Sequence, residues 1–248
     1  MNPIRELAAR LRQARQVLVL TGAGISAESG IATFRDAQSG LWSRFRPEDL
    51  ATPEAFRRDP ALVWRWYAWR REQVAQAQPN AAHRALVDIA QRVPTTLVTQ
   101  NVDDLHQRAG SPDVIALHGS IARTICSVTK LNIDADWLAA HPGEPPRSPH
   151  HADGLARPGV VWFGENLPPD ALDRAEAAAR ACDVVLAIGT SALVYPAAGL
   201  PGTAQRNGAW FAEINPQATP LTPTADLAVA QAAGTAMPAV LAAWEEYA

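Results

Sequence analysis

The chain has 248 residues, a formal net charge of −3 and two cysteines. This length can bury one full hydrophobic core with insertions, the small net charge gives no reason to expect nucleic acid, and two cysteines cannot form a disulfide framework. We find neither the apolar core of a signal peptide nor a membrane span, so we expect a cytoplasmic protein that contacts no membrane, and we expect it to be a monomer.

Apolar runs that are typical of buried strands alternate with helical patterns along the chain. Strands are expected at residues 17–20, 96–99, 114–117, 184–188 and 210–214, and helices at residues 4–16, 81–91 and 171–181. Such alternation predicts an α/β fold with a Rossmann-like parallel sheet that is covered by helices on both faces. Two stretches interrupt it. Residues 45–78 form a helical insert rich in tryptophan, and residues 123–156 are rich in loops and proline.

The first predicted strand runs into a glycine turn that is followed by a predicted helix. The spacing Gly22-x-Gly24-x-x-Ala27 fits the dinucleotide-binding fingerprint, whose third position accepts Gly or Ala. Small residues let backbone N–H groups approach a pyrophosphate, and the start of a helix adds a favourable dipole. Many parallel-sheet proteins carry a glycine turn here, so the turn alone leaves the ligand open.

Polar side chains follow two further predicted strands. Gln100, Asn101 and Asp103 come directly after one strand, and His118 follows the next. Because ligands bind outside the carboxyl ends of the strands in an open parallel sheet, we expect these side chains to line one crevice. Taken singly, each residue also fits a simpler interpretation, in which the amides cap a turn and the histidine is an ordinary loop residue.

Several stretches of this sequence carry a family signature when they are taken together. They are GAGISAESGIATFR (residues 22–35), TQNVDDLHQRAG (99–110), LHGS (117–120), RPGVVWFGE (157–165), GTS (189–191) with VYPAA (194–198), and EIN (213–215). These stretches resemble, in order and spacing, the motifs of the bacterial sirtuins, a family of NAD-dependent protein deacylases.

The resemblance implies NAD as cofactor and an acyl-lysine protein or peptide as substrate. In the family's reaction the acyl-lysine amide oxygen attacks C1′ of the nicotinamide ribose, nicotinamide leaves, and a base activates the ribose 2′-hydroxyl. The products are free lysine, nicotinamide and O-acyl-ADP-ribose. His118 matches the base, a role that suits imidazole because its pKa lies near neutral pH. Asn101 matches the residue that orients the ribose, and Asp103 matches the one that grips the nicotinamide carboxamide.

Further residues match the family's cofactor and substrate sites. Cofactor binding is implied for Gly22, Ala23, Gly24, Ser26, Phe34, Arg35, Gln100, Asn101, Val102, Asp103, Gly189, Thr190, Ser191, Asn215 and Ala233. Substrate binding is implied for Tyr67, Arg70, Val161, Trp162, Phe163 and Val194. Phe34 is expected to shield the reactive carbon from water, and Arg35 to meet phosphate. Residues 160–165 are read as an extended edge to which a peptide adds as a strand; the alternative is a buried connecting strand.

The resemblance also divides the chain into domains. Residues 1–44, 84–122 and 157–248 are expected to form the Rossmann-like NAD-binding domain. Residues 45–83 form a helical insert, and residues 123–156 form a degenerate zinc module; the two inserts together make a small domain.

The zinc module departs from the family, which usually holds a structural zinc with two Cys-x-x-Cys pairs. Here the first pair begins with Cys126 and ends with Thr129, and the second begins with Ser148 and ends with His151, so one of four thiolates remains. A structural zinc site needs four nitrogen or sulfur ligands, and neutral hydroxyls are poor substitutes. We therefore expect no bound metal.

Two alternatives for this module stay open. Cys126 with His141, His150 and His151 could form an improvised zinc site. A module that folds without metal needs another source of stability, and an apolar contact made by Trp137 and Leu138 is a candidate.

Tyr67 and Arg70 stand three residues apart in the helical insert, so on a helix they share a face. An arginine fork and a phenol hydroxyl together suit a carboxylate. The pair resembles the Tyr-x-x-Arg pair of the sirtuin subclass that removes succinyl and malonyl groups, whose bacterial members often remove acetyl groups as well. Periodicity alone favours a plainer interpretation, in which Arg65, Arg70 and Arg71 form a solvated basic face.

Other functions are also compatible with these motifs. Mono-ADP-ribosyl transfer starts from the same cleavage of the nicotinamide bond, and a non-catalytic NAD-binding regulator results if the degenerate module disrupts the peptide cleft. A dehydrogenase that transfers hydride is disfavoured, because Trp42 and Arg44 lie where the usual acidic residue would stand, about 20 residues past the glycine turn.

Overall fold

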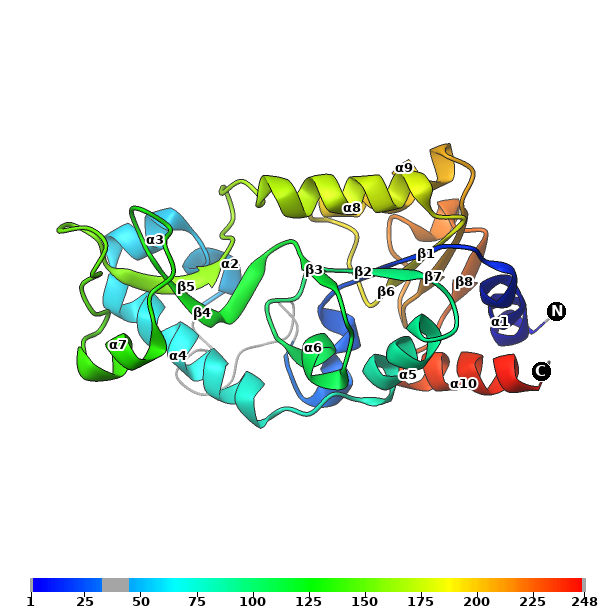
Figure 1. The fold of residues 1–248 in the computed structure, drawn as a ribbon, viewed down its shortest axis with the longest axis horizontal. Helices are drawn as coiled ribbons and strands as arrows, with labels where there is room; N and C mark the ends of the chain where they lie inside the picture. Colours follow the sequence, from blue (N-terminus) through cyan, green and yellow to red (C-terminus); the bar gives the residue numbers. More distant parts are fainter. Residues whose placement is uncertain (1, 33–44, 247–248) are drawn as a thin grey trace.

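Six parallel strands form the central sheet of the larger part of the molecule. They are β1 (Val17–Thr21), β2 (Thr95–Thr99), β3 (Val114–Ala116), β6 (Val184–Ile188), β7 (Trp210–Ile214) and β8 (Leu227–Val229). Their order is β3-β2-β1-β6-β7-β8, and every neighbouring pair is parallel (Figure 1). The computed structural model on which this description rests covers residues 2–32 and 45–246. The five predicted strands are confirmed, and the short β8 was not predicted.

The strand order fixes where a ligand can bind. From β1 the chain moves outward through β2 and β3, then returns to β6 on the other side of β1 and moves outward through β7 and β8. The central strands β1 and β6 are buried along their whole length, which explains why their sequences are continuous apolar runs. At the carboxyl ends of β1 and β6 the connections diverge to opposite sides, so this point is the topological switch point.

Helices cover both faces of the sheet. On one face lie α1 (Pro3–Gln13), α5 (Ala81–Ala90) and α10 (Ala233–Glu245), and on the other α8 (Pro169–Ala181) and α9 (Leu200–Arg206) (Figure 1). Leu7 and Leu11 of α1 are fully buried, and each contributes about 1.5–3 kcal/mol of hydrophobic stabilisation. The short α6 (Leu105–Ala109) follows β2, and the 3₁₀ helices η4 (Ala197–Gly199) and η5 (Thr222–Thr224) lie in loops.

The segment after the glycine turn differs from the prediction. In place of one helix, the structure has two short 3₁₀ helices, η1 (Ala23–Ile25) and η2 (Ala27–Ser29). Gly30 adopts a left-handed conformation, with φ of 83°, and ends the second one. This segment therefore supplies backbone N–H groups but no long helix dipole.

The small domain lies at the opposite end of the molecule from the chain termini (Figure 1). Its two strands, β4 (Gly119–Cys126) and β5 (Ala156–Val160), pair antiparallel, and α2 (Pro47–Leu50), α3 (Pro53–Arg58), α4 (Pro60–Gln76) and α7 (Ala135–Ala140) surround them. Phe56, Trp66, Tyr67 and Trp162 form the centre of its apolar core. β4 spans the predicted domain boundary at residues 122 and 123, because one strand leads from the loop that carries His118 into the module.

In the part of the chain that the structure describes, no helix is both long and apolar enough to cross a membrane.

Candidate active site

Two glycine-containing loops meet at the switch point of the sheet. The N–H of Gly24, after β1, donates to the carbonyl oxygen of Gly189, after β6, at 2.8 Å. A Cβ atom on Gly22 would lie 2.7 Å from the Cα of Thr190, and one on Gly24 would lie 2.7 Å from the Gly189 oxygen. Gly189 also has a φ of +60°, which disfavours any side chain. The glycines are therefore needed for the close approach of two backbones.

A buried polar cluster adjoins this contact and joins the loops after β1 and β2. The hydroxyl of Ser26 donates to Asp103 Oδ2 at 3.0 Å and accepts from the Asn101 amide at 3.1 Å. The backbone N–H of Leu105 donates to the other carboxylate oxygen of Asp103. All three side chains are buried, and burial raises the pKa of Asp103 above its ordinary value. The cluster holds one amide and one carboxylate in fixed orientations.

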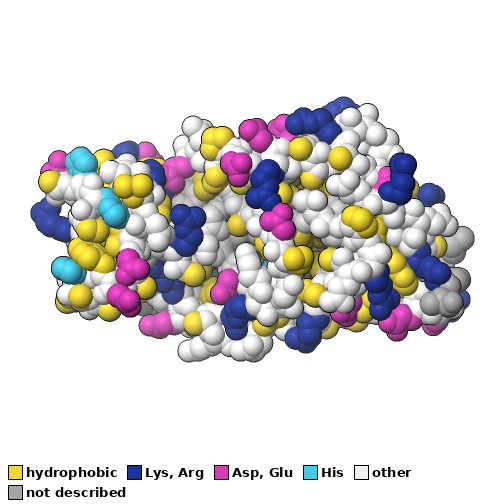
Figure 2. All heavy atoms as spheres, viewed as in Figure 1, with side chains coloured by type: hydrophobic (Ala, Val, Ile, Leu, Met, Phe, Trp, Pro, Cys, Tyr) yellow, Lys and Arg dark blue, Asp and Glu magenta, His cyan; other side chains and the backbone are white. Residues whose placement is uncertain are grey.

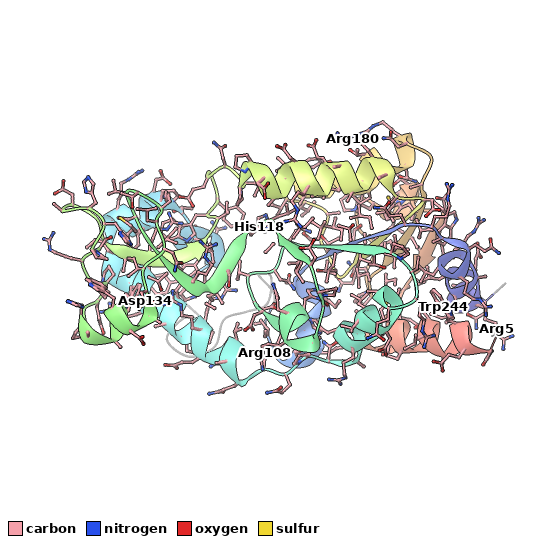
Figure 3. The ribbon with its side chains drawn as sticks, viewed as in Figure 1. Arg5, Arg108, His118, Asp134, Arg180 and Trp244 are labelled. Carbon is pink, nitrogen blue, oxygen red and sulfur yellow. The ribbon has the colours of Figure 1, made fainter. Side chains whose placement is uncertain are left out.

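His118 lies between the sheet domain and the small domain, where β3 ends and β4 begins (Figure 3). Its Nδ1 is 2.7 Å from the backbone carbonyl oxygen of Gln100. A carbonyl oxygen only accepts, so Nδ1 carries the proton and Nε2 of the neutral ring keeps its lone pair. Burial lowers the pKa of His118 below its ordinary value, more than the Gln100 bond raises it. The ring is therefore a neutral base with a fixed tautomer.

A third group of contacts gathers around Thr190. The Gln100 amide donates to the Thr190 hydroxyl at 2.8 Å, and the Asn215 amide donates to its carbonyl oxygen at 2.8 Å. Gln100 follows β2, Thr190 follows β6 and Asn215 follows β7. These contacts bring residues from three strand ends together at one edge of the sheet.

Comparison with known proteins identifies the family. The sequence profile of the Sir2 family matches residues 22–196. The chain belongs to the Sir2 family. An NAD-dependent protein deacylase of Ralstonia nicotianae is 53% identical over 234 residues, which span 94% of this chain and 93% of that protein. A second of the same name, from Aquifex aeolicus, is 51% identical over 89% of this chain and 92% of that protein.

Solved structures of the Sir2 family agree with the fold. A crystal structure of a Sir2 homologue in complex with NAD superposes with a TM-score of 0.90 at 46% identity, over 98% of this chain and 94% of that one. A Sir2 protein bound to acetylated peptide superposes with a TM-score of 0.85 at 30% identity, over 96% of this chain and 97% of that one.

The described residues fit a dinucleotide. The glycine contact brings backbone close to the crevice, as a pyrophosphate requires. The carboxylate of Asp103 accepts one bond on each oxygen, and each oxygen has a second lone pair with which to accept an N–H of a carboxamide. Phe34 and Arg35, the other two cofactor residues expected in this Sir2 loop, lie outside the described residues.

The remaining cofactor candidates differ in their surroundings. The carbonyl oxygen of Val102 accepts from the N–H of Ile121, so this residue links the cofactor loop to the small domain. Ser191 is partly exposed. Ala233 is buried in the core at the first turn of α10, and the next N–H, of Gly234, donates to Glu28 of η2. Contact of Ala233 with a cofactor stays a prediction.

The residues at the family's zinc position do not fit zinc. Cys126 is the single thiol there, and its sulfur accepts hydrogen bonds from Thr129 and Ser148. Burial alone would raise the pKa of Cys126, but these bonds outweigh it and lower the pKa to about 7. No group of three or more His, Cys, Asp or Glu within residues 2–32 and 45–246 is placed to hold a metal ion.

The three histidines of the improvised site are engaged elsewhere. His141 stacks on Trp137 at 4.1 Å between ring centroids, His150 contacts the carbonyl oxygen of Asn132, and His151 accepts from Asp153. All three are exposed, and histidine side chains are visible over the small domain in Figure 2. Trp137 and Leu138 pack with Trp64 against the apolar cluster of Cys126, Ile133 and Ala156, so the expected apolar contact is confirmed.

Tyr67 and Arg70 lie on the inner side of α4. Tyr67 is buried, and burial raises its pKa, so its hydroxyl stays protonated. The Arg70 guanidinium lies 5.9 Å from the Tyr67 ring centroid and 5.0 Å from that of Trp66. Arg71 donates to the carbonyl oxygens of Ile121 and Arg123. The three arginines therefore form no common solvated face, because only Arg65 is exposed.

The predicted substrate segment begins at the last residue of β5 and leads into a turn. The N–H of Val161 donates to the carbonyl oxygen of His118, and Phe163 and Gly164 form a turn closed by the Glu165 N–H and the Trp162 carbonyl. Trp162 is buried in the small-domain core, whereas Phe163 is 43% exposed and Val194 is partly exposed.

An ion pair not expected from the sequence holds this segment. Arg157 is buried and makes a two-bond contact with Glu165, at 2.7 and 2.9 Å. Its guanidinium also stacks on the Trp162 ring, 3.3 Å from the centroid. Burial alone would raise the pKa of Glu165, but bonds from Arg157 and the Trp162 N–H lower it to about 2. The RPGVVWFGE motif carries both residues, eight positions apart, which is the signal that could have found the pair.

Proposed function

We propose that this Sir2-family chain removes acyl groups from protein lysines in a reaction that consumes NAD. The observation that carries the proposal is the state of His118. Its Nδ1 is committed to the Gln100 carbonyl, so a neutral Nε2 is left to take a proton. That base stands at the strand ends where the amide of Asn101 and the carboxylate of Asp103 are already fixed by Ser26.

In this proposal each site residue has a separate role. NAD supplies the electrophilic ribose carbon and the nicotinamide leaving group. Asp103 accepts the carboxamide N–H groups of the nicotinamide, Asn101 orients the ribose, and His118 Nε2 accepts the proton of a ribose hydroxyl. The Ser26 bonds keep Asn101 and Asp103 in place before the substrate arrives, which lowers the entropic cost of reaching the reactive geometry.

The acyl group is proposed to include acidic chains, succinyl and malonyl, as well as acetyl. Arg70 supports this specificity because its charge interacts with the buried carboxylate of Asp103, which indicates that the guanidinium lies near the proposed site. The Tyr67 hydroxyl accepts from Trp162 and keeps its own hydrogen for donation. A guanidinium and a neutral phenol can together pair a carboxylate in a partly apolar pocket.

Side-by-side rates on acetyl-, succinyl- and malonyl-lysine peptides with NAD test the proposal. We expect mass spectrometry to detect free lysine peptide, nicotinamide and O-acyl-ADP-ribose. A peptide that gains the mass of ADP-ribose would indicate mono-ADP-ribosyl transfer instead. Absence of nicotinamide release with every acyl-peptide, from protein that binds NAD, would indicate a non-catalytic regulator.

A further inference from the structure

Four buried polar side chains lie directly behind the catalytic loop. Thr21 ends β1, Thr99 ends β2, His106 lies on α6 and His83 lies on α5, and each is at most 1% exposed. The Thr21 hydroxyl donates to Thr99 Oγ1 at 2.9 Å, and Thr21 Oγ1 is 3.0 Å from His106 Nε2. The two imidazole centroids are 4.8 Å apart. The proposed reaction uses none of these four residues.

The tautomer of His83 follows from its backbone contact. Its Nδ1 is 3.3 Å from the N–H of Asn80, as part of a capping box at the start of α5. An amide N–H only donates, so Nδ1 of His83 is unprotonated and its Nε2 carries the hydrogen. That Nε2–H is buried without a hydrogen-bond partner among the described residues.

The tautomer of His106 follows from the threonine pair. The single hydroxyl hydrogen of Thr21 is directed to Thr99, so Thr21 accepts from His106, and Nε2 of His106 carries the hydrogen. Its Nδ1 is then unprotonated and carries a lone pair. This nitrogen too is buried without a partner in the part of the chain that the structure describes. Adjacent rings thus hold one unpaired donor and one unpaired acceptor.

This arrangement is the one that satisfies both rings. If Thr99 donated to Thr21 instead, Thr21 would donate to His106, and His106 Nδ1 would carry a hydrogen facing the His83 donor. Burial also opposes a second proton, because it lowers the pKa of His83 to about 4 and that of His106 to about 3. The unpaired donor of His83 and the unpaired acceptor of His106 are complementary, and a single bridging water would hydrogen-bond to both.

The hydrogen bonds that join His106, Thr21 and Thr99 form a hydrogen-bond chain, which ends on the loop that carries Asn101. Thr99 Oγ1 accepts the backbone N–H of Asn101 at 3.0 Å. At the other end, the amide of Asn80 donates to the Ile25 carbonyl at 2.7 Å and to the Ser29 hydroxyl at 3.0 Å. The same network therefore contacts the catalytic asparagine and the glycine loop.

We propose that His106 is a positioning residue for Asn101, acting through Thr21 and Thr99, and that His83 holds His106 in the tautomer that this role needs. The role of Asn101 rests on the proposed function. The hydrogen-bond chain does not, so its state can be tested separately.

Kinetics test the positioning role. We expect His106→Leu to lower kcat on an acetyl-lysine peptide about 10- to 100-fold, the range for a small misplacement of a catalytic group. His106→Gln, which keeps an N–H near the Nε2 position, should recover most of kcat. Thr21→Val should resemble His106→Leu, and the double variant should lose no more than either single one. A kcat for folded His106→Leu within twofold of wild type, or additive losses, would overturn the proposal.

Two further measurements separate this role from general instability and from failure of the proposed function. Val93→Ala serves as a control. It changes the apolar core at a residue that takes no part in the hydrogen bonds of His106, Thr21 and Thr99, so it should lower Tm while leaving kcat unchanged. Nitrogen NMR of the histidine rings, without NAD or peptide, should show a protonated Nε2 and an unprotonated Nδ1 in both His83 and His106. A protonated Nδ1 in either ring would reject the network even if the enzyme is active, and an inactive enzyme with the expected tautomers would reject only the proposed function.

Discussion

The indole nitrogen of Trp162 donates a 3.0 Å hydrogen bond to the hydroxyl oxygen of Tyr67. Both side chains are buried, and Phe56 packs against Trp162 at 5.2 Å between ring centroids. Replacement of Tyr67 by Phe would leave the indole N–H unpaired, at a cost of about 1–3 kcal/mol. A change at Tyr67 therefore mixes stability with specificity, and Arg70 offers the cleaner test of the acyl pocket.

Arg70→Met should lower desuccinylation about 10- to 100-fold through a raised KM. A charge-assisted hydrogen bond contributes about 1.5–3 kcal/mol, and the substrate carboxylate loses that partner. Deacetylation should change little, because an acetyl group has no charge to pair. Steady-state kinetics on both peptides check this, with Arg65→Met, an exposed change on the same helix, as the control. Equal losses on both peptides would point to a structural role for Arg70.

His118→Ala should abolish deacylation and leave NAD affinity within several-fold of wild type. A general base acts in the transition state and contributes on the order of 10²-fold or more. Formation of free lysine peptide, measured by mass spectrometry, and NAD binding by calorimetry check the two halves of the prediction. His141→Ala, an exposed histidine stacked on Trp137, is the matched control. Near-normal turnover of His118→Ala would remove His118 from the mechanism.

The purified protein should contain well under one zinc per chain and keep its activity in chelator. Only one thiol stands at the family's zinc position, and its hydrogen bonds come from hydroxyl and backbone groups. Elemental analysis measures the metal, and thermal unfolding with and without chelator measures its effect on stability. Stoichiometric zinc together with unfolding on chelation would favour the improvised site of Cys126 and histidines.

Gly189→Ala should impair both folding and NAD binding. The new Cβ would press on Gly24 and Ile25 and would sit on a residue with a φ of +60°. Gly208→Ala is the control for backbone strain alone, because Gly208 has a φ of +93° and no described atom lies within 4 Å of the position that its Cβ would take. Strain alone costs about 1–2 kcal/mol. We expect Gly189→Ala to lose clearly more in urea unfolding and to raise KM for NAD; equal effects would contradict the close contact.

The free energy of unfolding should fall as the pH falls below about 6.5. His83 and His106 have folded-state pKa values of about 4 and about 3, whereas an unfolded histidine has about 6.5. The unfolded chain therefore binds protons first, and each histidine removes roughly 1.4 kcal/mol per pH unit in this range. Urea unfolding at pH 7.5 and 5.5 measures the loss, and His83→Gln should reduce it. Parallel losses in both proteins would exclude His83 as a source.

Local pattern was enough to predict the scaffold and most of the crevice. Strands that are buried on both faces must be apolar along their length, so β1 and β6 could be recognised without knowledge of their neighbours. Because parallel strands place their carboxyl ends at one edge, Asn101, Asp103 and His118 could be assigned to one site from the sequence. The acyl specificity and the role of each residue came from family resemblance.

Only the tertiary structure decided which partner each polar side chain takes. His118 is a base of known tautomer because the Gln100 carbonyl, 18 residues away, meets its Nδ1. Trp162 faces the core because Tyr67, 95 residues earlier, accepts its N–H. His83 and His106 gain a function only as neighbours across two helices. The physical reason is that a hydrogen bond depends on distance and direction, which for residues far apart in sequence are set by the packing of whole elements and leave no local pattern.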